Sequence, residues 1–471
     1  MKKKTLSILI VSTIAALVLA AIACKNPVLD KVKAIAASAN PALSLAIGGT
    51  TVAAGGSYNL GSTALATTKN ATFTISNSGK DSLTASVTAS GNFSVGSQPS
   101  GSIAAGASSS FLISFTPTSP ESLKSGTVTV ASNDPNNKSF SFTVTGVGST
   151  ILLPKTGQTA VKLSGDDGSL GIGVAIPSPR FSTPVNNKIT DYLTGLMWTQ
   201  AANLDGQVPW ATALAYIQSQ NTAGYLSCND WRLPNREELR SMLDYSSSNP
   251  SSSLQSSQFT NVQVDIYWTS TRDSGKTQAW VLDFTDGTLS LDIIGNSHYL
   301  WLVRSTTNDS AIKLPYSGAP SSSTSGEDGS SSNSKGAAWP SQRFVARGDG
   351  TVTDLLTGLR WQAAPSATTM DWASAISAAA ALPHNGTSSW RLPNENELAS
   401  ILTAAPTTTV AAWLNSNGFS GAQSAYYWTS TAYAQATSPS PNSRWCAGMQ
   451  YGDLSPYDRG TAHYAIFVRS E

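Results

Sequence analysis

Hydrophobic and polar residues alternate in short runs between residues 41 and 148, which is the pattern of half-buried strands. The runs ATFTI, FLISF and FSFTV each place their large apolar side chains on one face: Phe73 and Ile75, then Phe111, Ile113 and Phe115, then Phe140, Phe142 and Val144. Turn clusters such as SNSGKDS and SNDPNNKS separate the runs. Strands this short, at this spacing, predict an all-β sandwich over 41–148.

From residue 150 onwards the sequence repeats itself. LPKTG…GDDGS…PSPRF returns as LPYSG…GEDGS…WPSQRF, TDYLTGLMW as TDLLTGLRW, DWRLPN as SWRLPN, YWTST as YWTST, and HYLWLVRS as HYAIFVRS. This duplication predicts two like-folded domains, copy 1 over 150–306 and copy 2 over 339–471. The Ser- and Gly-rich stretch 307–338 between them is predicted to be a flexible linker.

Each copy carries the signals of a strand, two helices and then several strands. Trp210, Leu214 and Ile217 fall at i, i+4 and i+7, which is the inner stripe of a helix. Asn235 and Glu238 are spaced to form a capping box at the start of a second helix, and copy 2 repeats that spacing. An Asp-Gly pair inside AWVLDFTDGTLSLDI predicts a hairpin turn. Each copy is therefore expected to be a compact α+β domain.

The ordered motifs TGLMW…DWRLPNREEL…YWTST…W…VRS resemble the Lcl C-terminal domain, which is named after a bacterial collagen-like adhesin. WRLP ahead of a helix is also similar to formylglycine-generating-enzyme-like domains, which share a C-type-lectin-like fold. The resemblance covers both copies. It implies a lectin-like topology and binding to carbohydrates, including sulphated glycosaminoglycans, by a surface adhesin.

The segment 41–148 resembles the Hydin-like, choice-of-anchor immunoglobulin-like domains of bacterial surface proteins, through FTISNSGKDSLTASVT…FLISFTPTSPESLKSGTVTVASNDP…FSFTVTGVG. In that family the domain implies a spacer or docking module rather than chemistry. The expected fold class is therefore multidomain: an all-β immunoglobulin-like sandwich followed by two α+β C-type-lectin-like domains.

The first 24 residues have the form of an export signal. Three lysines at 2–4 precede a mainly apolar run over 6–19, which is too short for a membrane span. The stretch AAIAC, ending at Cys24, resembles a bacterial lipobox, although Ala21 stands where such motifs usually carry Leu. We expect a signal peptide over 1–23, a lipid on Cys24 and a tether over 24–40. The protein is then exported and lipid-anchored to the cell envelope, at the outer membrane or cell surface; ordinary secretion is the alternative.

The near-neutral charge of the chain limits the classes of ligand that it is expected to bind. Only 12% of residues are charged and the formal net charge is +1, so the chain has no bulk attraction for nucleic acid. Residues 180–304 hold eight Lys or Arg against eleven Asp or Glu, and residues 340–471 hold seven against eight. Sulphated polysaccharides need clustered cations. The balance therefore favours neutral glycans or protein partners, and the sequence has no collagen-like Gly-X-Y region to support trimerisation.

Exposed aromatic side chains are the expected binding groups, because the C–H faces of sugar rings stack on Trp and Tyr. The candidates lie in the later strands and loops of both copies: Tyr267, Trp280, Trp301, Tyr427, Trp445 and Tyr451. A second set is expected to be structural, with tryptophans in the core and arginines paired to a carboxylate or to carbonyls: Trp198, Trp231, Arg232, Trp268, Trp361, Trp390, Arg391 and Trp428.

No catalytic, metal or cofactor site is predicted. His298 and His463 hold equivalent places but have no further ligands at suitable spacing. The oxygens of 244–250, Asp265 and Asp273 form no ordered calcium pattern. Only two cysteines follow Cys24, at unmatched places of the repeat, namely Cys228 and Cys446, and two thiols suit them at least as well as a disulfide. No nucleophile stands beside a base, so an enzyme is not expected.

Together these patterns predict an adhesin-like envelope protein whose tandem lectin-like domains bind carbohydrate or host matrix. The alternative is a non-catalytic structural or protein-interaction module of the envelope. The expected partners are a carbohydrate or an extracellular-matrix or envelope protein, and the membrane through the N-terminal lipid. Nucleic acid is not an expected partner.

Overall fold

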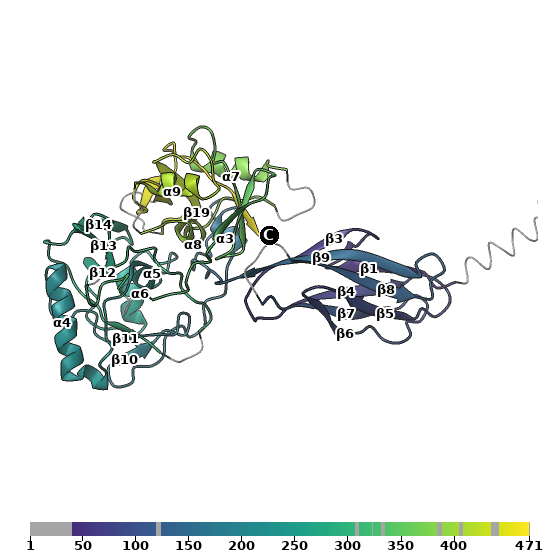
Figure 1. Ribbon diagram of the computed structural model, residues 1–471, viewed down its shortest axis with the longest axis horizontal. Coiled ribbons are helices and arrows are strands. Elements are labelled where there is room, and N and C mark those ends of the chain that lie inside the picture. Colours follow the sequence, from purple (N-terminus) through teal and green to yellow (C-terminus); the bar gives the residue numbers. More distant parts are fainter. Residues whose placement is uncertain are drawn as a thin grey trace, which may run out of the picture. The chain divides into compact units, whose positions relative to one another are not determined.

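The computed structural model describes residues 40–118, 124–306, 310–322, 324–330, 335–383, 389–404, 408–434 and 442–470. The predicted signal peptide, Cys24, nearly all of the tether and His384 lie outside the described residues. The chain forms two compact units (Figure 1). The first unit is built from most of the sequence before residue 146, and the second contains everything after it together with two short segments, 61–67 and 116–124.

The first unit is a β-sandwich. One sheet has the strand order β2-β1-β4-β7-β6 and the other the order β3-β9-β8-β5. The strands are β1 (Leu43–Ile47), β2 (Thr50–Thr51), β3 (Ser57–Ala64), β4 (Lys69–Asn77), β5 (Ala85–Ala89), β6 (Phe93–Ser97), β7 (Ser108–Phe115), β8 (Lys124–Ser132) and β9 (Ser139–Ser149). Phe73 packs against Phe111 within its sheet, at 5.4 Å between ring centroids, and against Phe142 of the other sheet, at 5.1 Å. The predicted sandwich is confirmed.

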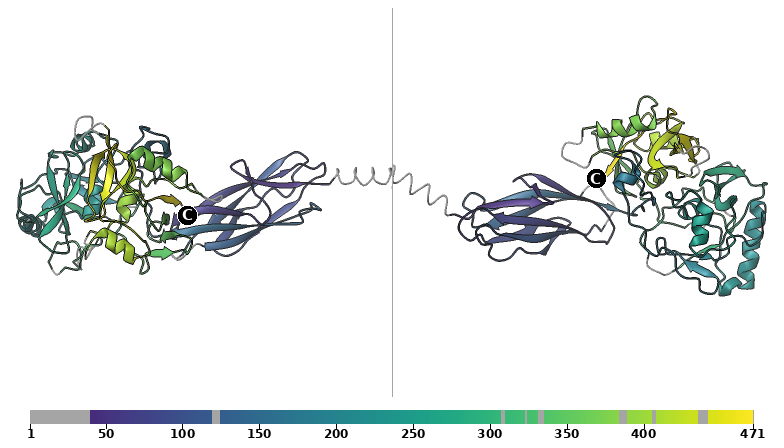
Figure 2. Two further views of the ribbon diagram at one scale, coloured as in Figure 1. Left: turned by 90° about the horizontal axis from the view of Figure 1, so that it is seen from above. Right: turned by 180° about the vertical axis from the view of Figure 1, so that it is seen from behind.

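In the second unit the two copies build a similar order of elements, except that copy 2 adds the strand β16 and copy 1 adds the 3-10 helix η1, and they lie side by side (Figure 2). Copy 1 contains β10 (Lys188–Thr190), β11 (Leu196–Thr199), α4 (Trp210–Ala223), η1 (Tyr225–Ser227), α5 (Arg236–Arg240), α6 (Pro250–Ser256), β12 (Ile266–Arg272), β13 (Gln278–Asp283), β14 (Leu289–Ile293) and β15 (Val303–Ser305). Copy 2 contains β16 (Phe344–Ala346), β17 (Thr351–Asp354), β18 (Leu359–Gln362), α7 (Trp372–Ala380), α8 (Glu395–Ser400), α9 (Val410–Ser416), β19 (Tyr426–Ala432), β20 (Ser443–Gly448), β21 (Leu454–Asp458) and β22 (Val468–Ser470).

The local signals read from the sequence are confirmed. Helix α4 begins at Trp210 and buries Trp210 and Ile217, while Leu214, the third residue of the predicted stripe, is only partly buried. Helix α5 has the expected capping box, in which Asn235 accepts from the Glu238 main chain and Glu238 accepts from the Asn235 main chain, and α8 has its counterpart. Strands β13 and β14 pair antiparallel across the predicted turn. Each copy adds one helix that was not predicted, α6 in copy 1 and α9 in copy 2.

The two copies share one sheet and one interior. A six-stranded sheet runs β12-β13-β14-β21-β20-β19, and β14 pairs with β21 antiparallel at Leu289 and Leu454. The largest core cluster draws buried residues from both copies. Within it Trp280 of copy 1 donates its indole N–H to the main-chain oxygen of Ala404 in copy 2, at 2.9 Å. The prediction of two separate domains is wrong in this respect, because each copy completes the core of the other.

The segments that precede the copies are exchanged between them. Leading segment 1 (residues 153–174) lies against copy 2: the amide of Asn394 donates to the Ile172 oxygen at 3.2 Å, and Thr431 donates to Asp167 at 2.7 Å. Leading segment 2 (residues 314–322, 324–330 and 335–337) lies against copy 1 in the same way. There Asn235 donates to the Lys335 oxygen at 3.2 Å, and Thr271 donates to Asp328 at 2.7 Å.

Leading segment 2 occupies the stretch that was predicted to be a flexible linker. Its Glu327 and Asp328 side chains are fully buried. Arg272 of copy 1 holds Glu327 through two hydrogen bonds of 2.7 Å each. A charged side chain is buried only when it is paired or hydrogen-bonded. The linker prediction is therefore wrong for the described part of this stretch. Its Ser- and Gly-rich composition suggests a flexible linker, but the buried side chains of Glu327 and Asp328 fix it against copy 1.

A buried aspartate secures each leading segment. Asp167 accepts from Thr156 at 2.6 Å and from Thr431 at 2.7 Å. Asp328 accepts from a serine hydroxyl at 2.5 Å and from Thr271 at 2.7 Å. Burial raises the pKa of both carboxyl groups to about 6, although the hydroxyl hydrogen bonds and an arginine of the opposite WRLPN motif act to lower it. A glutamate of the same motif adds to the rise in each case.

Replacing both buried aspartates with asparagine is expected to flatten the pH dependence of stability. A carboxyl whose pKa is raised on folding adds stability below its unfolded pKa, near 3.8, and loses it as the pH rises through about 6. The wild-type free energy of unfolding should therefore increase from pH 7 to pH 5 by about 1 kcal/mol per aspartate. Thermal melts of the wild type and the Asp167→Asn/Asp328→Asn variant at both pH values measure this. Equal slopes in the two proteins would contradict it.

Separating the copies is expected to leave both incomplete. Chains of residues 25–306 and 307–471 each lack a leading segment and half of the shared sheet, so the cluster around Trp280 and Leu289 becomes exposed. Each second-unit fragment alone should aggregate or melt without cooperativity, and co-expression should give a stable 1:1 complex. Size-exclusion chromatography and thermal melts measure this, with the sandwich in 25–306 as an internal control for folding. Two soluble fragments that melt cooperatively on their own would contradict it.

Candidate functional site

The aromatic residues predicted to form a binding face are mostly inside the protein. Five of the six candidates are buried: Tyr267, Trp280, Trp301, Tyr427 and Trp445. Only Tyr451 is exposed, at 52%, in the turn between β20 and β21. A buried ring cannot offer its face to a sugar, so the structure contradicts an exposed binding role for the five. Tyr451 alone of the set remains accessible.

The burial has a simple cause. The shared sheet is covered on both faces, so strand alternation does not separate an inner from an outer face here. In β12, Tyr267 belongs to the large shared core, while the next residue, Trp268, belongs to a second cluster behind α4. The polar atoms of four of the five buried candidate rings, all but Trp445, are also hydrogen-bonded internally. For example, the Tyr267 hydroxyl accepts from the Gln263 main chain at 2.8 Å, and the Trp301 indole donates to the Thr199 oxygen at 2.9 Å.

The residues interpreted as structural lie in the core or in ion pairs. All six tryptophans of that set are buried: Trp198, Trp231, Trp268, Trp361, Trp390 and Trp428. Arg232 makes two hydrogen bonds to Glu238, of 2.5 and 2.6 Å, and Arg391 makes the same pair with Glu397. Each glutamate is also the capping-box residue of its helix. The WRLPN motif thus links strand, helix cap and the docking place of a leading segment.

The histidines and cysteines act as local structural groups. His298 hydrogen-bonds Asp292 at 2.5 Å and packs edge-on against Trp268. His463 packs against Trp428 in the same way, and burial lowers its pKa. Within the described ranges there is no group of three or more His, Cys, Asp or Glu side chains placed to hold a metal. Cys228 and Cys446 are free thiols.

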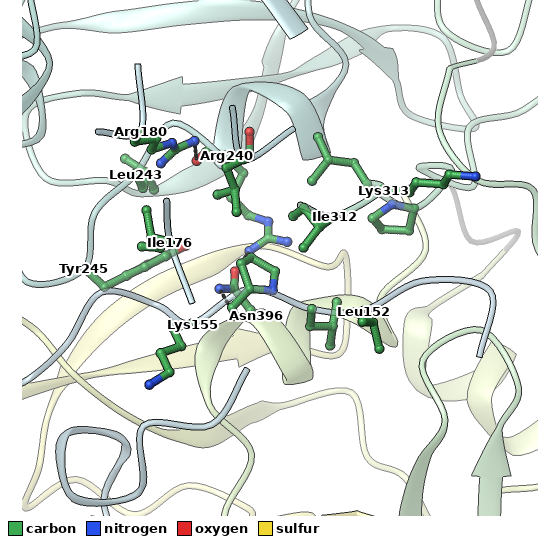
Figure 3. Close-up of a pocket in the computed structure, with 16 residues that line it drawn as sticks. Leu152, Lys155, Ile176, Arg180, Arg240, Leu243, Tyr245, Ile312, Lys313 and Asn396 are labelled. Atoms are coloured by element: carbon green, nitrogen blue, oxygen red, sulfur yellow. Dashed lines mark hydrogen bonds between the residues drawn. The ribbon is translucent and has the colours of Figure 1, made fainter. Parts of the chain in front are cut away.

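The junction of the copies is a closed polar cluster. Arg240 of α5 donates to Glu395 at 2.9 Å, to Asn396 at 2.8 Å and to Glu237 at 2.9 Å. Figure 3 shows Arg240 and Asn396 turned toward one another beside a cavity of about 20 Å³. Burial and the nearby Glu395 raise the pKa of Tyr245, which lines the same cavity, well above its usual value. The cavity has room for about one water molecule, so it is not a ligand site.

A larger groove lies on copy 1, between α4, the WRLPN segment (231–235) and leading segment 2. Its volume is about 260 Å³, and polar side chains that include Gln218, Asn221 and Lys335 line it. Much of that polarity is already used. Asn221 exchanges two hydrogen bonds with the main chain of Trp231, at 2.7 and 2.8 Å, and Asp230 pairs with Arg304 at 2.7 Å. The groove offers space but few free groups.

Two tryptophans that the sequence reasoning passed over are the ones that reach the surface. Eleven of the thirteen tryptophans are buried, while Trp339 and Trp413 are only partly buried. Their ring centroids lie 5.5 Å apart. At the matching places of copy 1 the chain has Ile176 and Ser253. This difference between the repeats was visible in the sequence and could have singled the pair out.

Family models match the two kinds of domain in the chain. The Lcl C-terminal domain model matches residues 187–304 and 350–469, and the HYDIN/CFA65/VesB-like, Ig-like domain model matches residues 55–147. Both leading segments fall outside these matches. No curated protein sequence matches the chain.

Several solved structures share similarity with about a quarter of the chain. A protein of unknown function from Porphyromonas gingivalis W83 is 19% identical, with a TM-score of 0.20, over 24% of this chain and 48% of that one. The chain thus spans about half of that protein. The seventh PapD-like domain of human CEP192 is 12% identical, with a TM-score of 0.18, over 24% of this chain and 87% of that one. A FixG-related protein from Vibrio parahaemolyticus is 8% identical, with a TM-score of 0.16, over 23% and 96%.

The domain matches agree with the architecture described above. Among the described residues no helix is long and apolar enough to cross a membrane. The Lcl matches fall on the two copies of the second unit and together cover half of the chain, and the Ig-like match falls on the sandwich. The family suggests a surface, adhesin-like role. The chain therefore belongs to the Lcl C-terminal domain family, and carries two copies of that domain behind an immunoglobulin-like domain.

Proposed function

We propose that this protein is a lipid-anchored envelope protein whose second unit binds carbohydrate or host matrix as an adhesin. The observation that carries the proposal is the match of both copies to the Lcl C-terminal domain. A lectin-like α+β topology for each copy belongs to the same proposal, supported by the order of short strands and helices. The immunoglobulin-like domain then acts as a spacer between the anchor and the binding unit.

The cations of copy 1 favour a neutral ligand over a sulphated one. Of the eight Lys and Arg residues in 180–304, six take part in ion pairs within the protein: Arg180, Arg232, Arg236, Arg240, Arg272 and Arg304. A guanidinium already bound to a carboxylate cannot replace the counterions of a polyanion. Glycosaminoglycan binding, which the family resemblance implies, is therefore not part of the proposal.

A non-catalytic structural or protein-interaction role is the second candidate. The large shared core favours this role, because two copies that share one core suit a scaffold as well as a lectin. In both cases the protein is proposed to act without catalysis. Envelope or matrix proteins are then the partners, and the membrane is reached through the lipid on Cys24.

A glycan array probed with residues 25–471, which lack the lipid, is expected to show saturable binding to neutral glycans. Heparin should not bind at 0.15 M salt, because six of the eight cations in 180–304 are already held in ion pairs within the protein. Titration calorimetry with the best array ligand measures the affinity. A blank array together with recovery of one envelope protein in pull-downs would favour the second candidate and reject the first.

Mass spectrometry of the mature protein is expected to find Cys24 as the first residue, with a diacylglycerol on its thiol and an acyl chain on its amine. The lipobox-like AAIAC stretch places that cysteine directly after the apolar run. A Cys24→Ser variant should lose membrane association and appear in the soluble fraction. A mature chain that begins at another residue without a lipid would remove the anchor from the proposal.

A further inference from the structure

The partly exposed tryptophans sit on a frame that both copies share. In copy 2, Arg343 is held by Asp354 through two hydrogen bonds of 3.0 Å, and its guanidinium lies 4.8 Å from the Phe344 ring centroid. In copy 1 the same arrangement is built by Arg180, Asp191 and Phe181, with the guanidinium 4.7 Å from the ring.

The aromatic residues on that frame occur in copy 2 only. Trp339 and Trp413 stand where copy 1 has Ile176 and Ser253, and a nearby tyrosine, Tyr316, stands where copy 1 has a lysine. Because copy 1 folds around the same frame without them, the fold does not require aromatic side chains at these places. A surface tryptophan that packing does not demand is a candidate for binding.

The rings are held in place before any ligand arrives. The Trp339 indole N–H donates to the main-chain oxygen of Tyr316 at 2.9 Å, and the Arg343 guanidinium lies 4.6 Å from the Trp339 ring centroid. Trp413 rests edge-on against Phe344, with 5.6 Å between centroids. Fixed rings lose little side-chain freedom on binding, which favours affinity.

The surroundings select among ligands. The nearest cation, Arg343, is buried and paired, so the patch offers no free positive charge to an anionic sugar. The other exposed large apolar side chains of the described residues come from other segments: Val161, Leu163, Leu170, Val185, Tyr192, Val264, Ile293 and Tyr451. The patch is therefore described by its own ring contacts, Tyr316 with Trp339 and Trp339 with Trp413. Ser416 and Asn417 provide polar groups beside it, each bonded to the Trp413 oxygen at 2.8 Å.

From these observations we infer that Trp339 and Trp413, with Tyr316, form a stacking site for the C–H face of a neutral hexopyranose ring. The inference rests on the proposed glycan-binding function and gives it a location. It also sets the number of such sites at one per chain, in copy 2, because copy 1 lacks the rings.

The test exchanges each tryptophan for the residue of the other copy, in Trp339→Ile and Trp413→Ser. Residues 25–471 and the two variants are titrated with soluble neutral hexasaccharides of glucose and of N-acetylglucosamine. Each variant should bind about tenfold more weakly, equivalent to about 1.4 kcal/mol, while thermal melts show that it still unfolds cooperatively. Calorimetry should give one site per wild-type chain. Acrylamide quenching of the wild-type tryptophan fluorescence should fall when the sugar binds.

Controls separate the site from the function. Tyr451→Ser removes an exposed aromatic side chain elsewhere and should leave binding unchanged. Trp339→Phe and Trp413→Phe keep a ring and should retain most of the affinity even if the smaller residues destabilise the fold. If the Trp339→Ile and Trp413→Ser variants both bind sugar as tightly as the wild type, the site is overturned and the proposed function stands. No binding to any sugar by the wild type would overturn both.

Discussion

The arrangement of the second unit depends on a carboxylate that each copy receives from the segment leading into the other. Asp167 and Asp328 are placed beside the Arg–Glu pair of the opposite WRLPN motif, and two hydroxyls hold each of them. A buried carboxylate is costly unless its oxygens are bonded. In each case one hydroxyl comes from the aspartate's own leading segment and the other, of Thr431 or Thr271, comes from the opposite copy. The exchange therefore supplies one of the two hydrogen bonds of each buried carboxyl.

The junction also distinguishes one copy from the other. At matching places of the two helices the chain has Arg236 and Arg240 in copy 1 but Glu395 and Ala399 in copy 2. Arg240 spans the junction to Glu395, so the contact joins unlike partners. Two copies of the first kind would bring arginines together, and two of the second would bury unpaired glutamates. These unlike charges therefore disfavour the association of two copies of the same kind, as buried polar residues do in coiled coils.

Much of the fold could be predicted from local patterns, because caps, turns and strand alternation are encoded within a few residues. Asn235 with Glu238, the Asp-Gly turn and the sandwich strands are examples. The exchange could not be predicted that way. Asp167 and Asp328 lie in polar, Gly- and Ser-rich stretches, and nothing nearby shows that their partners are 264 and 57 residues away. The candidate site failed for a related reason. The alternation of the aromatic strands predicts one exposed face, but core clusters cover both faces. The partly exposed rings are instead indicated by the difference between the repeats at Trp339 and Trp413.

The exchange of the leading segments determines the order in which the two copies can complete their folding during synthesis. The WRLPN motif of copy 1 is synthesised well before leading segment 2, which docks on it, so copy 1 cannot complete these contacts until that segment has been made. Leading segment 1, which docks on copy 2, is by contrast already made when copy 2 is synthesised. A chain crossing a membrane from the N-terminus would therefore need protection during passage and would close into its final form only after the last strands had emerged.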